Sequence, residues 1–473
     1  MSIRSYAFAS LSALALMGCA AGPDYVAPTP PPQATTGPFI SAEEGVVTAT
    51  PLPADWWRLY DDPVLDGLVA DAFAANTDIR QATARIARAR AGLRGAGAGR
   101  LPQTGFGASG SYDRVSESEV PVGVDRDGSV FDAGLSVSYE VDLFGRVGRG
   151  VEAARADLES AQADADAVRV IVVADTTRAY ADAASAAAQI DVAETALALL
   201  DESLRLTRRR HEAGLENGLA VPRIETLRQQ RAATIPALEA QRAAALFALA
   251  TLTGRTPSEL PEIAGQRSVA LEITEPLPVG DGAALLARRP DIRAAERRLA
   301  ADTARIGVAT ADLYPRITLG GSVGATGPNL GDLFAGGPFR FLVGPLIDWA
   351  FPNSEPVRAR IDAAEAGANE SLAAFDGAVL TALQEAETAL SHYARALEQR
   401  QSLQAAKDAA ERAATITRAR QREGVVNSLD LLDAERTLAE ATAQLAEQDA
   451  QVSRRQIDVF RALGGSWSTA QDG

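Results

Sequence analysis

Apolar and polar side chains alternate strictly along one stretch of the chain, FDAGLSVSYEVDLFG, which runs from Phe131 to Gly145. The odd-numbered positions up to Leu143 are apolar, and small or polar residues occupy the positions between them. A period of two places successive side chains on opposite faces, so the pattern predicts a strand with one apolar and one polar face. Most of the surrounding sequence is instead rich in Ala, Leu, Arg, Glu and Gln, which favour helices.

Four strands and four long helices are predicted by such patterns. The strands are expected at about 104–113, 130–143, 316–325 and 339–351, in two pairs joined by loops rich in Gly, Pro, Ser and Asp. The long helices are expected at about 147–210, 221–252, 355–422 and 428–463. Their apolar residues recur at steps of three and four, which is typical of coiled-coil seams and equally of ordinary bundle packing. The first long helix alone would extend about 95 Å, far more than the thickness of a membrane.

The second half of the chain repeats the first. Asp78 and Asp291 begin matching Asp-Ile-Arg segments 213 residues apart, and Pro102 and Pro315 have the same separation. An internal duplication of this kind gives both halves one architecture. We therefore expect a first structural repeat at 61–280, a second at 281–465 and a C-terminal tail at 466–473.

The N-terminus predicts export and lipid attachment. A short apolar run at 7–17 is too short to span a membrane and has the form of a signal-peptide core, so residues 1–18 are assigned to a signal peptide. The Leu-Met-Gly-Cys sequence that follows resembles a bacterial lipobox and makes Cys19 the predicted lipidation site. A cysteine without lipid is the alternative. Ala20, where Asp would favour retention in the inner membrane, favours the outer membrane, and the proline-rich segment 19–60 is expected to be extended.

Composition excludes several kinds of site. The net charge of −16 argues against nucleic acid, because no basic tract could neutralise phosphates. One cysteine permits no intrachain disulfide, and two histidines, His211 and His392, make a zinc site improbable. No metal, cofactor or catalytic set is therefore expected.

The predicted strands require more than one chain. Membrane barrels begin at about eight strands, and open sheet edges are not tolerated in lipid. Strands of roughly ten residues nevertheless have the right length to cross an outer membrane at a tilt. Three chains would supply twelve strands, and their polar faces would line a water-filled lumen. We expect this pore to be faced by Asp132, Glu140, Asp142 and Asp348.

Three segments and the duplication together resemble a known family. The segments are RRPDIRAAERRLAADTARIGVATADLYPRITLGGSVG, IPALEAQRAAALFALATLTG and CAAGPDYVAP. They resemble the outer membrane factor family, the TolC-like channels of tripartite efflux pumps, and in particular its NodT-type lipoprotein branch. The resemblance covers essentially all of the mature chain. It implies a mainly α fold with a membrane β part, in which a trimeric long-helix α-barrel continues into a twelve-stranded β-barrel. A mixed equatorial region is implied near 40–60, 255–282 and the C-terminal tail.

The resemblance also implies function and partners. Such a protein is a passive trimeric exit duct in the outer membrane of a Gram-negative cell, extending into the periplasm, for drugs or other small molecules. Its partners would be two further copies of the chain, a periplasmic membrane-fusion adaptor, outer membrane lipid and an inner-membrane pump, most simply of the resistance-nodulation-division type. The family has no catalytic site and binds no nucleotide.

Tip and gate residues follow from the same resemblance. Two turns between long helices would dock the adaptor, and they contain Gly214, Gly218, Gly424 and Asn427. Glycine suits a left-handed helix end, and asparagine suits a helix start. Two aspartates that narrow the pore entrance in the family match Asp430 and Asp433, whose spacing of three places them on one helix face. From the residues alone, two solvated helix carboxylates are the alternative.

Three other functions are weighed against this one. A channel for type I protein secretion would share the fold and differ in its client. A trimeric surface anchor also donates four strands per chain, but as one C-terminal block, whereas the strands here form two internal pairs. A lipid-anchored periplasmic enzyme would leave the strands without an explanation.

Overall fold

The computed structural model describes residues 20–29, 38–116, 118–123, 125–215, 217–334 and 339–465. The chain divides into two compact units, which we describe separately. The first unit consists of Met1–Pro28, Arg85–Gln162 and Ala294–Phe375, and the second of Thr29–Ala84, Ala163–Arg293 and Asp376–Gly473. Each unit takes segments from both sequence repeats, so the compact units do not coincide with the two repeats.

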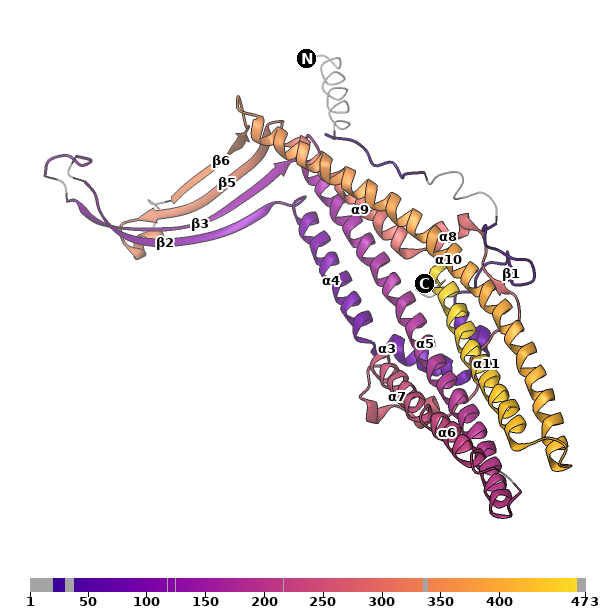
Figure 1. Ribbon diagram of the computed structural model, residues 1–473. Coiled ribbons are helices and arrows are strands. Elements are labelled where there is room, and N and C mark those ends of the chain that lie inside the picture. The colour runs from indigo at the N-terminus through magenta and orange to yellow at the C-terminus, as the bar shows by residue number, and fades with distance from the viewer. Residues whose placement is uncertain are drawn as a thin grey trace. The chain divides into compact units, whose positions relative to one another are not determined.

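The first unit contains a four-stranded antiparallel sheet in the order β2-β3-β5-β6 (Figure 1). Its strands are β2 (Gln103–Arg114), β3 (Asp127–Val141), β5 (Arg316–Gly327) and β6 (Phe339–Asp348). Strand β3 ends two residues before, and β6 three residues before, the ends expected from the alternating pattern. β2 and β6 are edge strands with open hydrogen-bonding groups within the described sheet.

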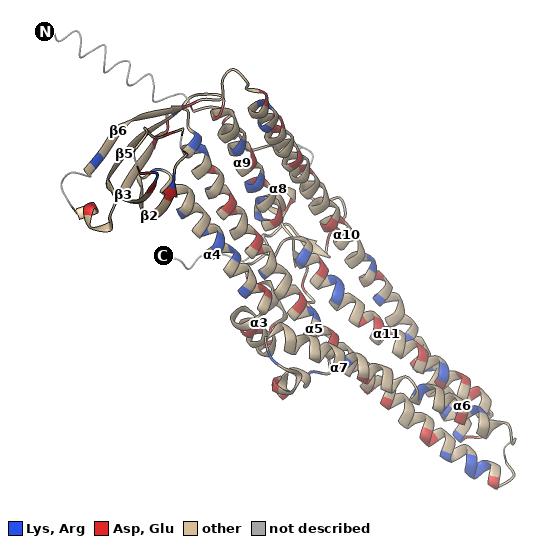
Figure 2. Ribbon diagram, turned by 90° about the vertical axis from the view of Figure 1, so that its left-hand side faces the viewer, with Lys and Arg blue, Asp and Glu red and all other residues tan. Residues whose placement is uncertain are grey.

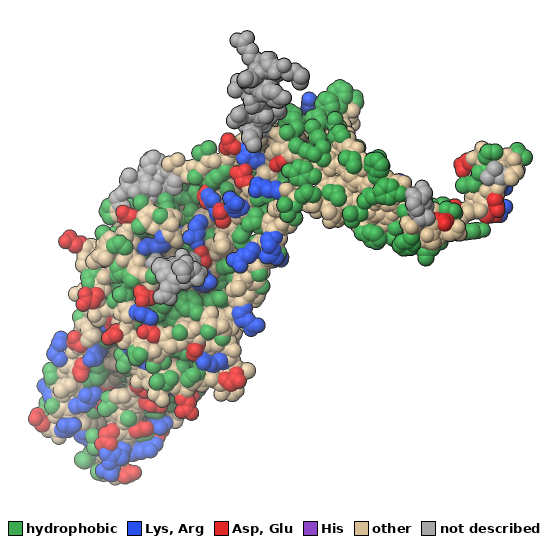
Figure 3. All heavy atoms as spheres, turned by 180° about the vertical axis from the view of Figure 1, so that it is seen from behind, with side chains coloured by type: hydrophobic (Ala, Val, Ile, Leu, Met, Phe, Trp, Pro, Cys, Tyr) green, Lys and Arg blue, Asp and Glu red, His purple; other side chains and the backbone are tan. Residues whose placement is uncertain are grey.

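The register of the sheet separates an apolar face from a polar face. One cross-strand row joins Phe106, Leu135, Val323 and Phe341, which are 76%, 45%, 40% and 74% exposed. The neighbouring rows on this face add Tyr112, Val137, Tyr139, Leu319, Val343 and Ile347, all of them exposed. Figure 3 shows hydrophobic side chains gathered over the strands. The opposite face consists mostly of Gly, Ser, Thr and charged residues. The exposed apolar residues Val130, Leu342 and Leu346 are exceptions on that face.

Four helices lead into and out of the two hairpins. Helices α4 (Thr77–Ala98) and α9 (Pro290–Ala311) precede β2 and β5, and the long helices α5 (Arg146–Glu212) and α10 (Glu355–Arg422) follow β3 and β6. Part of α5 has the length and hydropathy of a membrane span. Its Val172, Val173 and Ala174 are nevertheless at most 4% exposed, because they pack in apolar clusters of the second unit.

The second unit has the larger apolar core. Trp56 stacks on Phe460 of α11 (Ser428–Ala462) with ring centroids 4.7 Å apart. The buried carboxylate of Asp62 caps α3 (Pro63–Ala75) and accepts a hydrogen bond from the Tyr180 hydroxyl. A short parallel pair, β1 (Val47–Thr48) with β4 (Leu277–Pro278), and helix α8 (Gly282–Arg288) complete this mixed region.

The segment predicted as one helix over 221–252 forms two helices. α6 (Ala220–Ala232) is followed by its C-cap residue Ala233, and α7 (Ile235–Leu252) begins after its N-cap residue Thr234. Pro236 lies in the first turn of α7, where its missing N–H is tolerated. In a continuous helix that proline would remove one backbone hydrogen bond and clash with the preceding turn. The proline therefore explains the break.

Candidate pore-lining and tip residues

Asp132 lies on the polar face of the sheet in a cross-strand network. Its Oδ2 accepts hydrogen bonds from the Thr326 hydroxyl at 2.6 Å and from Arg340 Nη2 at 2.5 Å. Three strands thus contribute one charged cluster to the face that the sequence predicts to line the pore.

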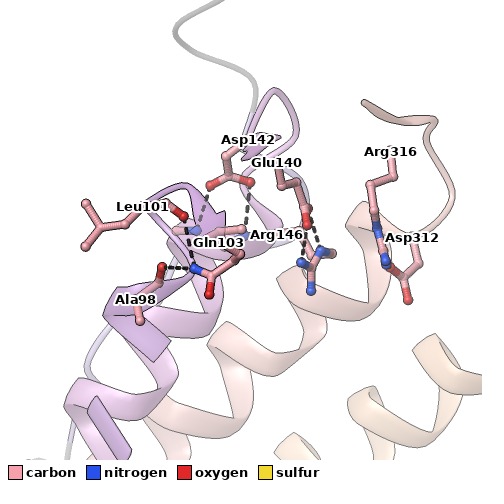
Figure 4. Close-up of polar contacts among 10 residues, drawn as sticks. Ala98, Leu101, Gln103, Glu140, Asp142, Arg146, Asp312 and Arg316 are labelled. Atoms are coloured by element: carbon pink, nitrogen blue, oxygen red, sulfur yellow. Dashed lines mark hydrogen bonds and ion pairs between the residues drawn. The ribbon is translucent and has the colours of Figure 1, made fainter. Parts of the chain in front are cut away.

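Two further predicted pore-facing acids, Glu140 and Asp142, lie where β3 meets α5 (Figure 4). Glu140 accepts a hydrogen bond from Arg146 Nε at 2.7 Å. Asp142 follows the last residue of β3, and its carboxylate accepts hydrogen bonds from the backbone N–H groups of Val147 and Gly148 at 3.0 and 2.7 Å. It therefore caps the start of α5, and this capping turn explains why β3 ends earlier than the alternating pattern suggests.

In the second repeat, Asn353 and not Asp348 caps the long helix, because its Oδ1 accepts a hydrogen bond from the Glu355 N–H at 3.4 Å. Asp348 is the last residue of β6 and is exposed, and within the described residues its carboxylate has no hydrogen bond or ion pair. It lines a cavity of about 130 Å³ together with Glu140, Arg146, Arg316 and Arg360. Figure 4 shows the neighbouring Asp312 and Arg316 close to one another. The pore-facing role of all four acids stays a prediction.

The two predicted tip turns have the same backbone design. Gly214 ends α5 with φ +73°, and Gly424 ends α10 with φ +76°. In each turn the N–H after the glycine bonds back five residues, from Leu215 to the Arg210 carbonyl and from Val425 to the Arg420 carbonyl. This is the pattern of a Schellman motif, which requires a left-handed residue and so favours glycine. Gly218 has no positive φ, so the backbone does not demand glycine there.

The predicted gate residues lie at the start of α11. Asn427 caps this helix, because its side-chain oxygen accepts hydrogen bonds from the N–H groups of Leu429 and Asp430. Asp430 and Asp433 are both exposed on the first turns. Asp433 forms an ion pair with Arg436 at 2.9 Å. Both carboxylates therefore lie at the predicted tip, and their role in narrowing a pore stays a prediction.

A buried glutamate that the sequence reasoning missed links the two helical hairpins. Glu435 of α11 is 7% exposed. It accepts a hydrogen bond from Ser203 of α5 at 2.7 Å and pairs with Arg418 of α10 at 3.2 Å. We call these three residues the Glu435 clasp. A signal was present, since Glu435 falls between Leu431 and Leu438 in the step of four and three where an apolar residue is expected.

The predicted lipidation site, Cys19, lies outside the described residues. The residues after it are docked on the first unit, where the Ala21 N–H donates to the Phe144 carbonyl at 2.9 Å. Gly22 has φ +82°, and a Cβ there would lie 2.5 Å from the Cα of Gly307. Glycine is thus needed at this close approach.

These features together define a class of protein. A sheet with one lipid-compatible face, a polar opposite face and open edges, continued by helices of 67 and 68 residues, is the protomer of an outer membrane channel.

Comparisons with known proteins agree with this class. The family model "Outer membrane efflux protein" matches residues 68–255 and 283–465, and the chain belongs to this family. Nodulation protein T of Rhizobium leguminosarum bv. viciae is 31% identical, with 97% of this chain and 93% of that protein aligned. The toluene efflux pump outer membrane protein TtgF of Pseudomonas putida is also 31% identical, over 96% of this chain and 95% of its own length. The solved outer-membrane channel OprN superposes with a TM-score of 0.88 at 36% identity, covering 95% of this chain and all of that one.

The family, the fold and the location expected from the sequence are therefore confirmed. The chain has the fold of TolC-like channels and is an outer membrane component of an efflux pump, which works with a periplasmic adaptor and an inner-membrane pump. The relatives and structural neighbours are channel proteins.

Proposed function

We propose that three copies of the chain close one twelve-stranded barrel and form a passive exit duct for small molecules. One observation carries the trimer: the sheet has an exposed apolar face and two edge strands, β2 and β6, without partners in the described residues. Open edges cannot remain in lipid, and a contact that joins β6 of one copy to β2 of the next closes into a ring. Three copies give twelve strands, which lies within the range of known barrels.

Native mass spectrometry of the full chain in detergent tests the trimer. A trimer that also conducts ions in planar bilayers is expected. A monomer or dimer as the only conducting species would refute the proposal.

We also propose that the cargo consists of apolar solvents and amphipathic antibiotics, and that the pump is of the resistance-nodulation-division type. TtgF is named for toluene efflux, and the lipoprotein start resembles the branch that serves resistance-nodulation-division pumps. Deleting the gene should increase susceptibility to apolar solvents and amphipathic antibiotics, and the chain supplied in trans should reverse the effect. Unchanged susceptibility with loss of a secreted protein would favour the protein-secretion alternative.

The lipid anchor and the gate complete the proposal. Acylation of Cys19 is supported by the lipobox and by the docking of the following residues, and mass analysis of the mature N-terminal peptide tests it.

The Asp430 and Asp433 carboxylates of three copies would form six negative charges around one axis. Their mutual repulsion would be relieved by dilation, protonation or a bound cation.

A further inference from the structure

A groove within the second unit opens beside the break between α6 and α7. Its volume is about 460 Å³, and its walls come from α5, from the junction of α6 with α7 and from α11. The break supplies one rim, because Pro236 starts a new helix there and the Thr234 hydroxyl donates back to the Arg231 carbonyl at 2.8 Å. We call this space the junction groove.

Alanines make up most of the lining of the junction groove. They include Ala193 and Ala196 of α5, Ala237 of α7, and Ala439 and Ala443 of α11. Val192 and Leu238 extend the apolar wall. Because protein interiors are close-packed, larger apolar side chains at the alanine positions would fill this space. The small side chains leave it open to another apolar body.

One polar group of the junction groove has no partner among the described residues. Arg231 lines the groove, and its Nη2 pairs with Glu440 at 3.3 Å. Its Nε is buried and forms no hydrogen bond within the described chain. Buried N–H groups are nearly always paired, because an unpaired one loses its hydration without compensation. This donor therefore marks the place of an acceptor atom on a bound molecule.

The charge around the junction groove favours a neutral ligand. Figure 2 shows acidic and basic residues on the helices around α6. Glu447 lines the groove, and with Glu440 it sets two carboxylates against the guanidinium of Arg231. A carboxylate ligand would meet net negative charge there, whereas a carbonyl oxygen can accept from Nε without adding charge.

Size distinguishes a small molecule from a protein partner. Small-molecule sites typically measure about 300–1,000 Å³ and combine an apolar wall with a few polar groups. A protein interface of standard size covers about 800 Å² on each partner and has about ten hydrogen bonds. The junction groove, with the unpaired Arg231 Nε as its polar anchor, matches the first description.

We infer that the junction groove binds a neutral, mainly apolar molecule with one oxygen acceptor, such as an aromatic ketone or ester, and that this molecule holds the two helical hairpins together. Its oxygen accepts from Arg231 Nε, and its apolar body contacts α5, α7 and α11. A ligand that touches all three helices stabilises their packed arrangement. The effect on the hairpins rests on the proposed duct, since it predicts that a molecule resembling the cargo reduces opening.

Photolabelling with benzophenone, a neutral diaryl ketone, tests the site. On irradiation its carbonyl carbon bonds to the carbon of a nearby C–H group, and the hydrogen moves to the carbonyl oxygen. For the full chain in lipid nanodiscs, we expect saturable labelling of peptides within 189–196, 231–238 and 439–447. Ala237→Leu should reduce this labelling at least about fivefold by filling the groove.

Ala240→Leu is the matched control, because Ala240 is an exposed alanine of the same helix outside the groove lining. It should label like the original protein. Labelling that is spread over the chain, that survives Ala237→Leu, or that falls equally in Ala240→Leu overturns the inference.

Competition tests the role of Arg231. Phenyl benzoate has a carbonyl oxygen, whereas diphenylmethane has a similar shape and no acceptor. Arg231→Lys keeps the positive charge but has a methylene in place of Nε. The ratio of the concentrations at which the two compounds block labelling should therefore shift about tenfold against phenyl benzoate in this variant. Each compound partitions into lipid equally in both samples, so an unshifted ratio excludes the hydrogen bond and overturns the inference.

Single-channel recording separates the inference from the proposed duct. Saturating phenyl benzoate should lower the open probability at least about threefold in the original protein and leave that of Ala237→Leu unchanged. A groove that is labelled while the open probability stays the same overturns the effect on the hairpins. A chain that is labelled in the groove but never conducts overturns the proposed duct and leaves only the binding site standing.

Discussion

Removing the carboxylate of the Glu435 clasp should loosen the two helical hairpins. Glu435 is 7% exposed and holds Ser203 and Arg418 from two other helices. A hydrogen bond to a charged group contributes about 1.5–3 kcal/mol when it is buried. Glu435→Ala should therefore cost about 2 kcal/mol, which changes the equilibrium between packed and separated hairpins by about 30-fold in each chain. Glu435→Gln keeps one acceptor and should cost about half as much.

Single-channel recording in planar bilayers measures the effect. We expect a higher open probability or conductance than in the original protein for both variants, and a larger increase for Glu435→Ala than for Glu435→Gln. Glu440→Gln is the matched control. Arg231 and Glu440 also link the hairpins, at 3.3 Å, but the Glu440 side chain is 49% exposed. Exposed pairs contribute about 0–1 kcal/mol, so this variant should behave like the original protein. Unchanged gating in Glu435→Ala, or equal gating changes in Glu440→Gln, would refute the reasoning.

Three further predictions concern the tips and the long helices. Asp430→Ala with Asp433→Ala should raise single-channel conductance and weaken block by divalent cations; unchanged conductance and block contradict the gate. Gly424→Ala should destabilise its turn by about 1 kcal/mol, seen as faster hydrogen exchange at 420–428, because φ there is +76°. Gly218→Ala, without a positive φ, should leave exchange in its turn unchanged. Burial raises the pKa of Asp166 from its ordinary 3.8 to about 6, against the lowering effect of Arg293 and Arg169. The folded state thus binds this proton more tightly, and the resulting stability is present below about pH 4 and lost as the pH rises through 6. The thermal stability of the original protein relative to Asp166→Asn should therefore be higher at pH 4 than at pH 7.5, and a difference that does not change with pH contradicts the burial argument.

Local periodicity made most of the fold readable from the sequence. The alternation around Leu135 places every second side chain on one face, and no distant contact is needed to see it. The glycines Gly214 and Gly424 were readable for the same reason, because a left-handed helix end is a local requirement. The break between α6 and α7 was missed, although Pro236 carried a local signal for it.

The sequence by itself determined the strands, the long helices, the duplication and the resemblance to a channel family, since each is encoded by neighbouring residues or by comparison along the chain. The tertiary structure alone decided which charges meet. Asp142 caps a helix, and Glu435 joins three helices. Arg293 forms an ion pair with Asp166, whereas Arg80, which lies 213 residues earlier at the matching position of the first repeat, forms none among the described residues. The physical reason is that a carboxylate and a guanidinium interact over a few ångströms in space, whereas their separation along the chain, 127 residues for Arg293 and Asp166, carries no trace of that distance.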